Sequence, residues 1–182
     1  MSVKDFKEKG FEYERQLAGK IGVWWCEDKK ALWRNTTSGA RATVMGGVFG
    51  GDIIPANGSS VTWPLCIEVK KAEGWKVEAF LQQNPANLLL THMLQCLHAS
   101  QLGCNKIPLL ICKKNYQKAL CFVYPHALKK FKPSTKPFLA RLKWITPVPE
   151  KLQAQYPFEG PIDFFCLHLD TFFQTFSKAD FV

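Results

Sequence analysis

The stretch "GGDIIPANGSSVTWPLCIEVKKAEGW", residues 50–75, combines strand-like apolar runs with buried-looking charges. It holds two apolar runs, residues 52–56 and 63–71, which are typical of two neighbouring strands. The residues "NGSS" between them favour a turn, because Asn, Gly and Ser suit the backbone angles and local hydrogen bonds of turns. Glu68 and Lys70 lie in the middle of the second run, which otherwise has the pattern of a buried strand.

Strand geometry predicts that these two charges lie side by side. Side chains alternate between the faces of a sheet, so Glu68 and Lys70 share one face, while Ile67 and Val69 take the other. Asp52 begins the neighbouring strand, and we expect it to reach the same end of the sheet. The alternative is a solvated edge strand, on which a same-face ion pair contributes little.

Two carboxylates and a lysine in this arrangement suit the hydrolysis of a phosphate ester. Carboxylates that converge repel each other and raise a pKa, and a divalent cation removes that penalty. Mg²⁺ prefers one or two carboxylates, waters and a substrate phosphate as ligands. Lys70 would then orient or deprotonate a metal-bound water, or stabilise the charge that develops at phosphorus. Glu14 would add a carboxylate if the first helix packs beside the strands.

The rest of the chain predicts alternating helices and strands. We expect a first helix over residues 3–22, ended by Gly22, and a clear helix over residues 86–103, ended by Gly103. The other expected elements are a strand at 31–36 with a partner at 23–26, a short helix at 77–83, strands at 108–114 and 119–125, and a glycine-rich loop over 38–51. This order predicts a mixed α/β layer architecture.

The chain changes character after Pro125. Residues 126–153 are rich in Lys and Pro and are expected to be irregular, whereas residues 161–176 are apolar enough to pack back as a strand or short helix. We therefore expect a core over residues 1–125 and a basic extension over 126–182 that packs on it, within one domain overall.

The charge of the chain indicates a polyanionic partner. The formal net charge is +9, and no Asp or Glu occurs from Ala79 to Pro149. That segment carries Lys106, Lys113, Lys114, Lys118, Lys129, Lys130, Lys132, Lys136, Arg141 and Lys143. Nucleic acid is the first candidate partner and an anionic membrane surface the second, beside a merely soluble basic face.

Composition predicts a globular protein of the reducing cytoplasm. The 182 residues are 47% hydrophobic, which is enough for a real core. The charged N-terminus lacks the apolar segment of a signal peptide, and no run is long enough to span a membrane. The cysteines number seven, and none has the C-x-x-C spacing of a zinc site, so we expect buried, reduced thiols.

Five segments in order carry a family resemblance. They are "KGFEYERQLA", "WRNTTSGA", "GGDII", "CIEVKKAEGW" and, after a helix, "IPLLICKKN". The set resembles the Asp…Glu-x-Lys signature of the PD-(D/E)XK nuclease superfamily, and is similar to archaeal and bacteriophage Holliday-junction resolvases over residues 8–124. The resemblance implies a restriction-endonuclease-like αβββαβ core, with a central mixed sheet flanked by helices.

The resemblance also implies roles for individual residues. Asp52, Glu68 and the backbone carbonyl of Val69 would be metal ligands, Lys70 the catalytic lysine, and Glu14 the first-helix glutamate, catalytic and a further ligand. Arg34 and Ser38 match the arginine and loop serine that approach the scissile phosphate, and Ser38 counts among the catalytic candidates. The metal would be Mg²⁺, with Mn²⁺ as a substitute, and the resolvases are symmetric dimers. The chain departs from the pattern where Gly51 replaces a proline, in a longer glycine-rich loop and in the basic extension.

Other residues are candidates for contact with DNA. The full set is Arg15, Arg34, Arg41, Lys71, Trp75, Lys76, Lys129, Lys130 and Lys132. Packing is the commoner role for a tryptophan at position 75, and a solvated surface is the alternative for the basic residues. Gln95 is a candidate to face a metal-bound water or DNA. The histidines have no ligand spacing and are expected on the surface or in the core.

The sequence thus predicts a Mg²⁺-dependent endonuclease of branched DNA, of the kind that resolves Holliday junctions during phage replication or recombination. The alternatives are a nickase, flap nuclease or exonuclease of the same fold, an inactive DNA-binding accessory protein, and a basic structural protein. The complete Asp52, Glu68 and Lys70 set argues against an inactive protein.

Overall fold

The computed structural model describes residues 3–36, 50–57, 60–102, 106–128 and 138–181. In chain order the elements are α1 (Val3–Cys26), β1 (Leu32–Arg34), β2 (Ile53–Pro55), β3 (Leu65–Lys71), α2 (Val77–Leu81), α3 (Leu88–Leu102), β4 (Ile107–Lys113), β5 (Leu120–Val123), β6 (Ala140–Lys143), α4 (Glu150–Gln155), β7 (Asp163–His168) and α5 (Leu169–Thr175). Two short 3₁₀ helices, Pro125–Ala127 and Lys178–Asp180, complete the described part. The glycine-rich loop predicted over residues 38–51 lies outside the described residues, apart from Gly50 and Gly51.

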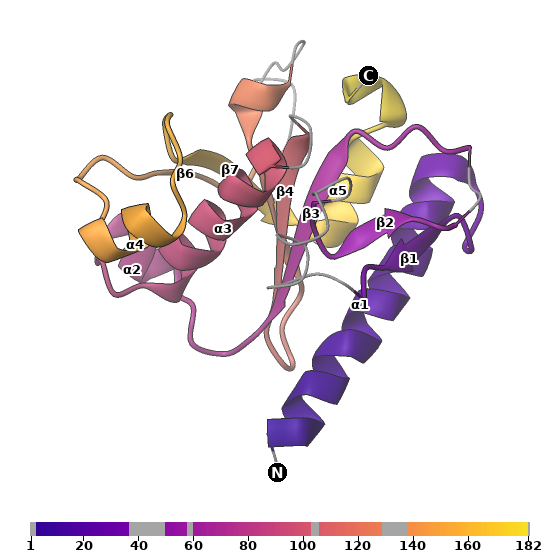
Figure 1. Cartoon of the computed structure of the whole chain (residues 1–182), viewed down its shortest axis with the longest axis horizontal. Coiled ribbons are helices and arrows are strands. Elements are labelled where there is room, and N and C mark those ends of the chain that lie inside the picture. Colours follow the sequence, from indigo (N-terminus) through magenta and orange to yellow (C-terminus); the bar gives the residue numbers. More distant parts are fainter. Residues whose placement is uncertain (1–2, 37–49, 58–59, 103–105, 129–137, 182) are drawn as a thin grey trace.

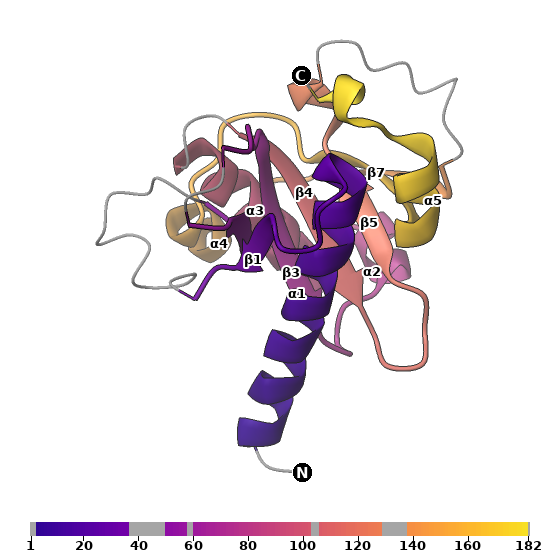
Figure 2. The ribbon, with the colours of Figure 1, turned by 90° about the vertical axis from the view of Figure 1, so that its right-hand side faces the viewer.

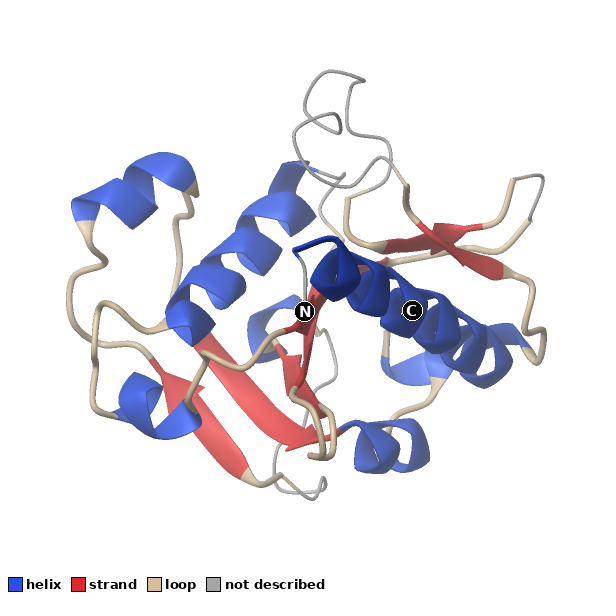
Figure 3. Cartoon of the chain, turned by 90° about the horizontal axis from the view of Figure 1, so that it is seen from below, coloured by secondary structure: helices blue, strands red, loops and turns tan. Residues whose placement is uncertain are grey.

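The described strands form one mixed sheet in the order β1-β2-β3-β4-β5-β7-β6. Only β3 and β4 pair in parallel, and α3 provides the crossover between them. Every other neighbouring pair is antiparallel. This is the mixed α/β sheet flanked by helices that the sequence predicts, and it is compatible with a restriction-endonuclease-like fold. Seen from below, the strands form a twisted layer with helices on either side (Figure 3).

The two faces of the sheet carry separate hydrophobic cores. Helices α1 and α5 cover one face, and α2, α3 and α4 cover the other (Figure 1). The alternation of β3 sorts its side chains between them, because Ile67 and Val69 join the core with Leu17 and Ile21 of α1. The opposite core is built on Leu110, Cys112 and Phe122 against α3. In Figure 2, α1 lies in front of the sheet and its first turns extend away from it.

The end of the first helix differs from the prediction. Helix α1 continues through Gly22 to Cys26, so the strand expected at residues 23–26 is wrong. The helix ends where Glu27 takes a φ of 60° and its N–H donates to the carbonyl of Val23 at 3.0 Å, a left-handed end that does not need glycine. Gly22 serves packing instead, since a Cβ there would lie 2.5 Å from the carbonyl oxygen of Asp28.

The C-terminal third is more regular than expected. Residues 126–153 contain β6 and most of α4, and the apolar segment 161–176 forms both a strand, β7, and a helix, α5. Strand β7 pairs with β5 and β6 pairs with β7, so the sheet of the core continues into the extension. Asp163 stabilises this edge: the residue is 1% exposed, and its carboxylate accepts hydrogen bonds from Arg141 at 2.7 and 3.0 Å.

The described cysteines are free thiols, and all of them except Cys26 are buried. Burial raises the pKa of the five buried thiols, to about 12 for Cys66 and Cys166, so these five stay protonated and behave as small apolar side chains. In the part of the chain that the structure describes, no helix combines the length and hydropathy needed to cross a bilayer.

Candidate active site

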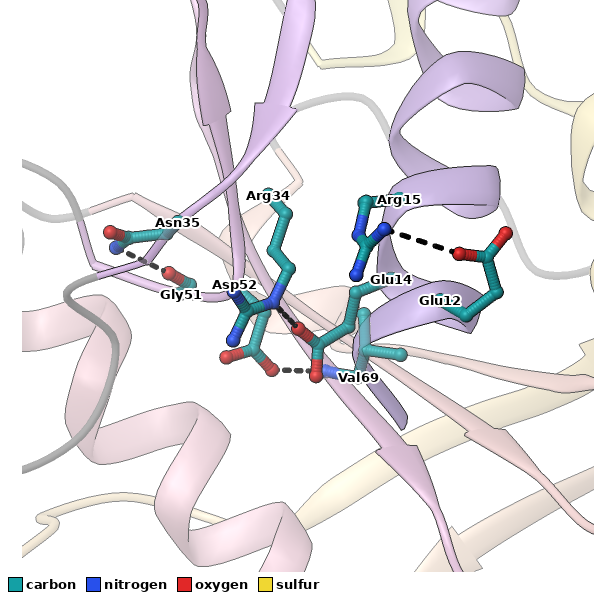
Figure 4. Close-up of polar contacts among 8 residues, drawn as sticks. All are labelled: Glu12, Glu14, Arg15, Arg34, Asn35, Gly51, Asp52 and Val69. Carbon is teal, nitrogen blue, oxygen red and sulfur yellow. Dashed lines mark hydrogen bonds and ion pairs between the residues drawn. The ribbon is translucent and has the colours of Figure 1, made fainter. Parts of the chain in front are cut away.

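The site forms where β2 and β3 separate. Ile53 of β2 pairs with Ile67 of β3. Just before β2, the N–H of Asp52 donates a hydrogen bond to the carbonyl of Ile67 at 2.7 Å. Two residues further along β3, the N–H of Val69 donates to the side-chain Oδ2 of Asp52 at 2.8 Å (Figure 4). A carboxylate thus replaces the backbone acceptor of a regular ladder, which fixes Asp52 at the point of separation.

Gly51 makes this close approach possible. Its φ is +93°, and a Cβ on it would lie 2.7 Å from the Ile67 carbonyl oxygen. Proline cannot adopt that φ, so the departure from the family pattern at this position follows from the backbone itself. Asn35, which is 3% exposed, supports the turn from β1, since its Nδ2 donates to the Gly51 carbonyl at 2.9 Å and its N–H to that of Asp52 at 2.7 Å.

Glu68 and Lys70 lie side by side on the α3 face of β3, as strand alternation predicts. Lys70 Nζ is 2.5 Å from Glu68 Oε1. Gln95, from the middle of α3, donates its Nε2 to the same oxygen at 2.6 Å. Glu68 is 4% exposed and Asp52 7% exposed, so both carboxylates are withdrawn from bulk water. The solvated-edge alternative does not describe this pair.

The electrostatics of the site favour the binding of a cation. Burial, followed by the negative charge of Asp52, raises the pKa of Glu68 to about 7. Burial alone would lower the pKa of Lys70, but the charge and hydrogen bond of Glu68 outweigh it and raise that pKa above its ordinary value. A single ammonium therefore does not neutralise the two acids, and added positive charge at Glu68 and Asp52 would relieve their repulsion.

Glu14 reaches the site from α1, and Arg34 of β1 holds it. Arg34 Nε donates to Glu14 Oε2 at 2.5 Å (Figure 4). The Arg34 guanidinium also lies 3.7 Å from the ring centroid of Phe11. Burial, together with the charge of Asp52, raises the pKa of Glu14 despite this arginine. Glu14 is therefore electrostatically part of the site, and its role as a metal ligand stays a prediction. Arg15 instead forms an exposed ion pair within α1, with 3.3 Å between its Nη1 and Glu12 Oε2.

The oxygen donors suit a hard divalent cation. Asp52 and Glu68 offer carboxylates, and the Val69 carbonyl points to the Asp52 side of β3, because the N–H and C=O of a strand residue share one edge. Among the described residues, no group of three or more His, Cys, Asp or Glu side chains is placed to hold a metal ion. Two carboxylates with a carbonyl, waters and a substrate phosphate fit Mg²⁺ or Mn²⁺, whereas the protonated thiol of Cys66 does not favour a soft metal.

The remaining predicted contacts are dispersed. Lys71 turns to the α1 face, with its Nζ 5.9 Å from the ring centroid of Tyr13, and Lys76 is exposed at the start of α2. Trp75 is 3% exposed and packs edge-to-face on Phe122, so packing describes it and it offers no ring face to DNA. Ser38, Arg41, Lys129, Lys130 and Lys132 lie outside the described residues.

Two residues at the site were not singled out from the sequence. Asn35 lies within the quoted "WRNTTSGA", but its bond to Gly51 depends on the pairing of β1 with β2. His92 lies one turn before Gln95 on α3, which is the only local signal for it. Among the described residues its two buried ring nitrogens have no hydrogen-bond partner, and burial, then the charge of Lys70, lowers its pKa to about 4.

Comparison with known proteins places the chain in a family. Neither the curated proteins nor the solved structures yield a match. A family model described as "Phage putative PDDEXK endonuclease" matches residues 5–182. That match takes in the site at Asp52, Glu68 and Lys70 as well as the C-terminal extension. The chain therefore belongs to this phage family of PD-(D/E)XK endonucleases, a class of nucleases that generally use divalent metal ions.

Proposed function

We propose that this protein is a Mg²⁺-dependent homodimeric endonuclease that hydrolyses phosphodiester bonds in branched DNA, with the four-way junction as its substrate. The observation that carries the proposal is the convergence of Asp52, Glu68 and Lys70 in one buried site, with the pKa of Glu68 raised to about 7. Such a site is costly for the metal-free protein, and a cation with a bound phosphate offsets that cost.

Each side chain of the site would have a definite part in the reaction. A divalent cation at Asp52, Glu68 and the Val69 carbonyl would supply positive charge to the phosphate and lower the pKa of a bound water. Lys70 Nζ would orient the attacking water and donate to the phosphate oxygens as their charge grows. Gln95 would hold Glu68 in place through its 2.6 Å hydrogen bond. Attack in line with the leaving O3′ would break the P–O3′ bond and leave a 5′-phosphate.

The support for branched DNA is the order of the motifs, which resembles that of the resolvases. A symmetric dimer would place one site on each of two opposed strands. The net charge of +9 supports binding to the phosphate backbone, which is independent of branching. The order of the motifs, and not the charge of the chain, therefore carries the junction specificity.

The test is cleavage of a labelled, immobile four-way junction in Mg²⁺, beside a linear duplex of the same sequence. Paired symmetric cuts in the junction that are lost in Asp52→Asn would support the resolvase. Equal cutting of both DNAs would retain the nuclease and remove the junction, and flapped and nicked duplexes would then identify the substrate. No cleavage of any DNA, with tight binding, would favour the accessory-protein alternative. Parallel reactions in Mn²⁺ test the choice of metal.

A further inference from the structure

Trp33 stands apart from the other tryptophans of the chain. It is 55% exposed, and within the described part of the molecule its indole makes no ring contact, side-chain hydrogen bond or cation contact. The remaining tryptophans, Trp24, Trp25, Trp63, Trp75 and Trp144, are at least partly buried, and each stacks on or packs against another aromatic ring. An exposed indole offers a large, rigid ring surface that can contact a partner.

Trp33 lies on the same face of the sheet as the candidate active site. Its neighbours Leu32 and Arg34 turn to α1, because Leu32 is in the α1-side core and Arg34 binds Glu14. Alternation then places Trp33 on the opposite face. That is also the face of Glu68 and Lys70, since Ile67 and Val69 fill the α1-side core.

The position of Trp33 along the sheet brings it near the reacting groups. It pairs with Ile54 of β2, which is only half-buried and extends the apolar surface on that face. Strand β1 is the edge of the sheet, and only β2 separates it from β3. Arg34, the next residue along β1, binds Glu14 of the site, and Ile54 lies two residues after Asp52.

We propose that Trp33 is a stacking platform for an unpaired nucleobase that lies beside the cleaved phosphate. The inference rests on the proposed nuclease function and adds to it the class of substrate, DNA with unstacked bases at the cut. A base within a duplex has both faces covered by its neighbours, whereas an unpaired base can offer one face to the indole. Ile54 would flank the base, and the basic surface of the chain would bind the backbone.

The test is equilibrium binding by fluorescence anisotropy in a Lys70→Ala background, which prevents cleavage during the measurement. The DNAs are a single strand, a fully paired duplex, and a gapped duplex carrying either a base or an abasic site at the unpaired position. Trp33→Ala should weaken binding to the single strand and the gapped duplex by about tenfold to a hundredfold, the range for one stacked base, and leave the paired duplex unchanged. Trp33→Phe should retain most of the affinity, since a phenyl ring still stacks. Ile145→Ala, at a side chain 73% exposed on another loop, is the matched control.

A second readout reports stacking directly. Single-stranded DNA should quench part of the tryptophan fluorescence of the Lys70→Ala protein, and Trp33→Phe should remove that part. Equal affinity of Trp33→Ala and its parent for every DNA would overturn the inference, as would an equal loss on single-stranded and paired DNA. If the wild type still cleaves DNA in either case, the nuclease proposal survives. Absence of both cleavage and binding would overturn both proposals.

Discussion

Replacement of Glu68 by glutamine should make the metal-free protein more stable, although it removes a predicted metal ligand. The ordinary pKa of a glutamate is 4.5, and burial with the charge of Asp52 raises that of Glu68 to about 7. The folded chain therefore binds this proton more tightly than the unfolded chain does. The difference corresponds to about 3 kcal/mol against the charged form in the folded state.

The sign of the pH dependence follows from the same difference. Below about pH 4.5 Glu68 is protonated in both states, so the wild type keeps the full stability of a neutral side chain there. That stability is lost as the pH rises, until the carboxyl is ionised in the folded chain above about pH 7. Glutamine is neutral throughout and has the same shape. Glu68→Gln should therefore exceed the wild type by up to about 3 kcal/mol at pH 8, with the gap closing near pH 4.

Urea unfolding in EDTA at a series of pH values measures this gap. With a slope of about 2 kcal/mol/M, the midpoint at pH 8 should rise by about 1.5 M. Glu159→Gln is the matched control, because Glu159 is exposed and should show no gap. Added Mg²⁺ should raise the midpoint of the wild type more than that of the variant, since the metal binds the folded carboxylates.

Two results would refute the reasoning about this site. A variant no more stable than the wild type at pH 8 would mean that Glu68 is not electrostatically strained. A gain of the same size at pH 4 and pH 8 would assign the effect to packing instead of charge.

Three further changes test the supports of the site and the sheet. Gly51→Ala should lower the free energy of unfolding by about 2 kcal/mol or more and abolish cleavage, because its Cβ would lie 2.7 Å from a backbone oxygen at a φ of +93°. Gly10→Ala is the control in the same unfolding and cleavage assays, since a Cβ at Gly10 would meet nothing within 4 Å. Gln95→Leu should fold normally, but kcat/KM should fall by about tenfold, because Glu68 loses a hydrogen-bond donor at 2.6 Å. The Mg²⁺ concentration that gives the half-maximal rate should rise, and an unchanged Mg²⁺ dependence would contradict this role. Asp163→Asn should lower the free energy of unfolding by about 2 kcal/mol at pH 7, since hydrogen bonds from Arg141 and His126 outweigh burial and lower the pKa of Asp163. The urea midpoints of the wild type and the variant should converge as the pH falls through that lowered pKa. A gap that stays constant with pH would contradict the assignment.

Local pattern was sufficient for the elements that carry the predicted chemistry. The alternation of "LCIEVKK" placed Glu68 and Lys70 on one face, and the structure pairs them at 2.5 Å. The periodic apolar stripe of the first helix and the crossover helix at α3 were predicted for the same reason. Each of these features depends on side-chain direction within a few residues, which the backbone geometry of one element sets.

Features that depend on distant partners were not predictable in this way. The donor from Gln95 to Glu68 joins residues 27 apart. Packing was the commoner role expected for Trp75, but its ring partner, Phe122, lies on another strand. The tail strands β6 and β7 were missed or left open because their pairing is decided by the edge that β5 leaves available.

Sequence pattern alone indicated which residues alternate, where the acids and the lysine enter a strand, and to which family the chain belongs. The separation of β2 and β3 at Asp52, the packing of α3 over Glu68 and the exposure of Trp33 on the same face became visible only in the folded chain. Periodicity is a property of one segment, whereas burial and the pKa of Glu68 arise from charges and atoms that several segments bring together.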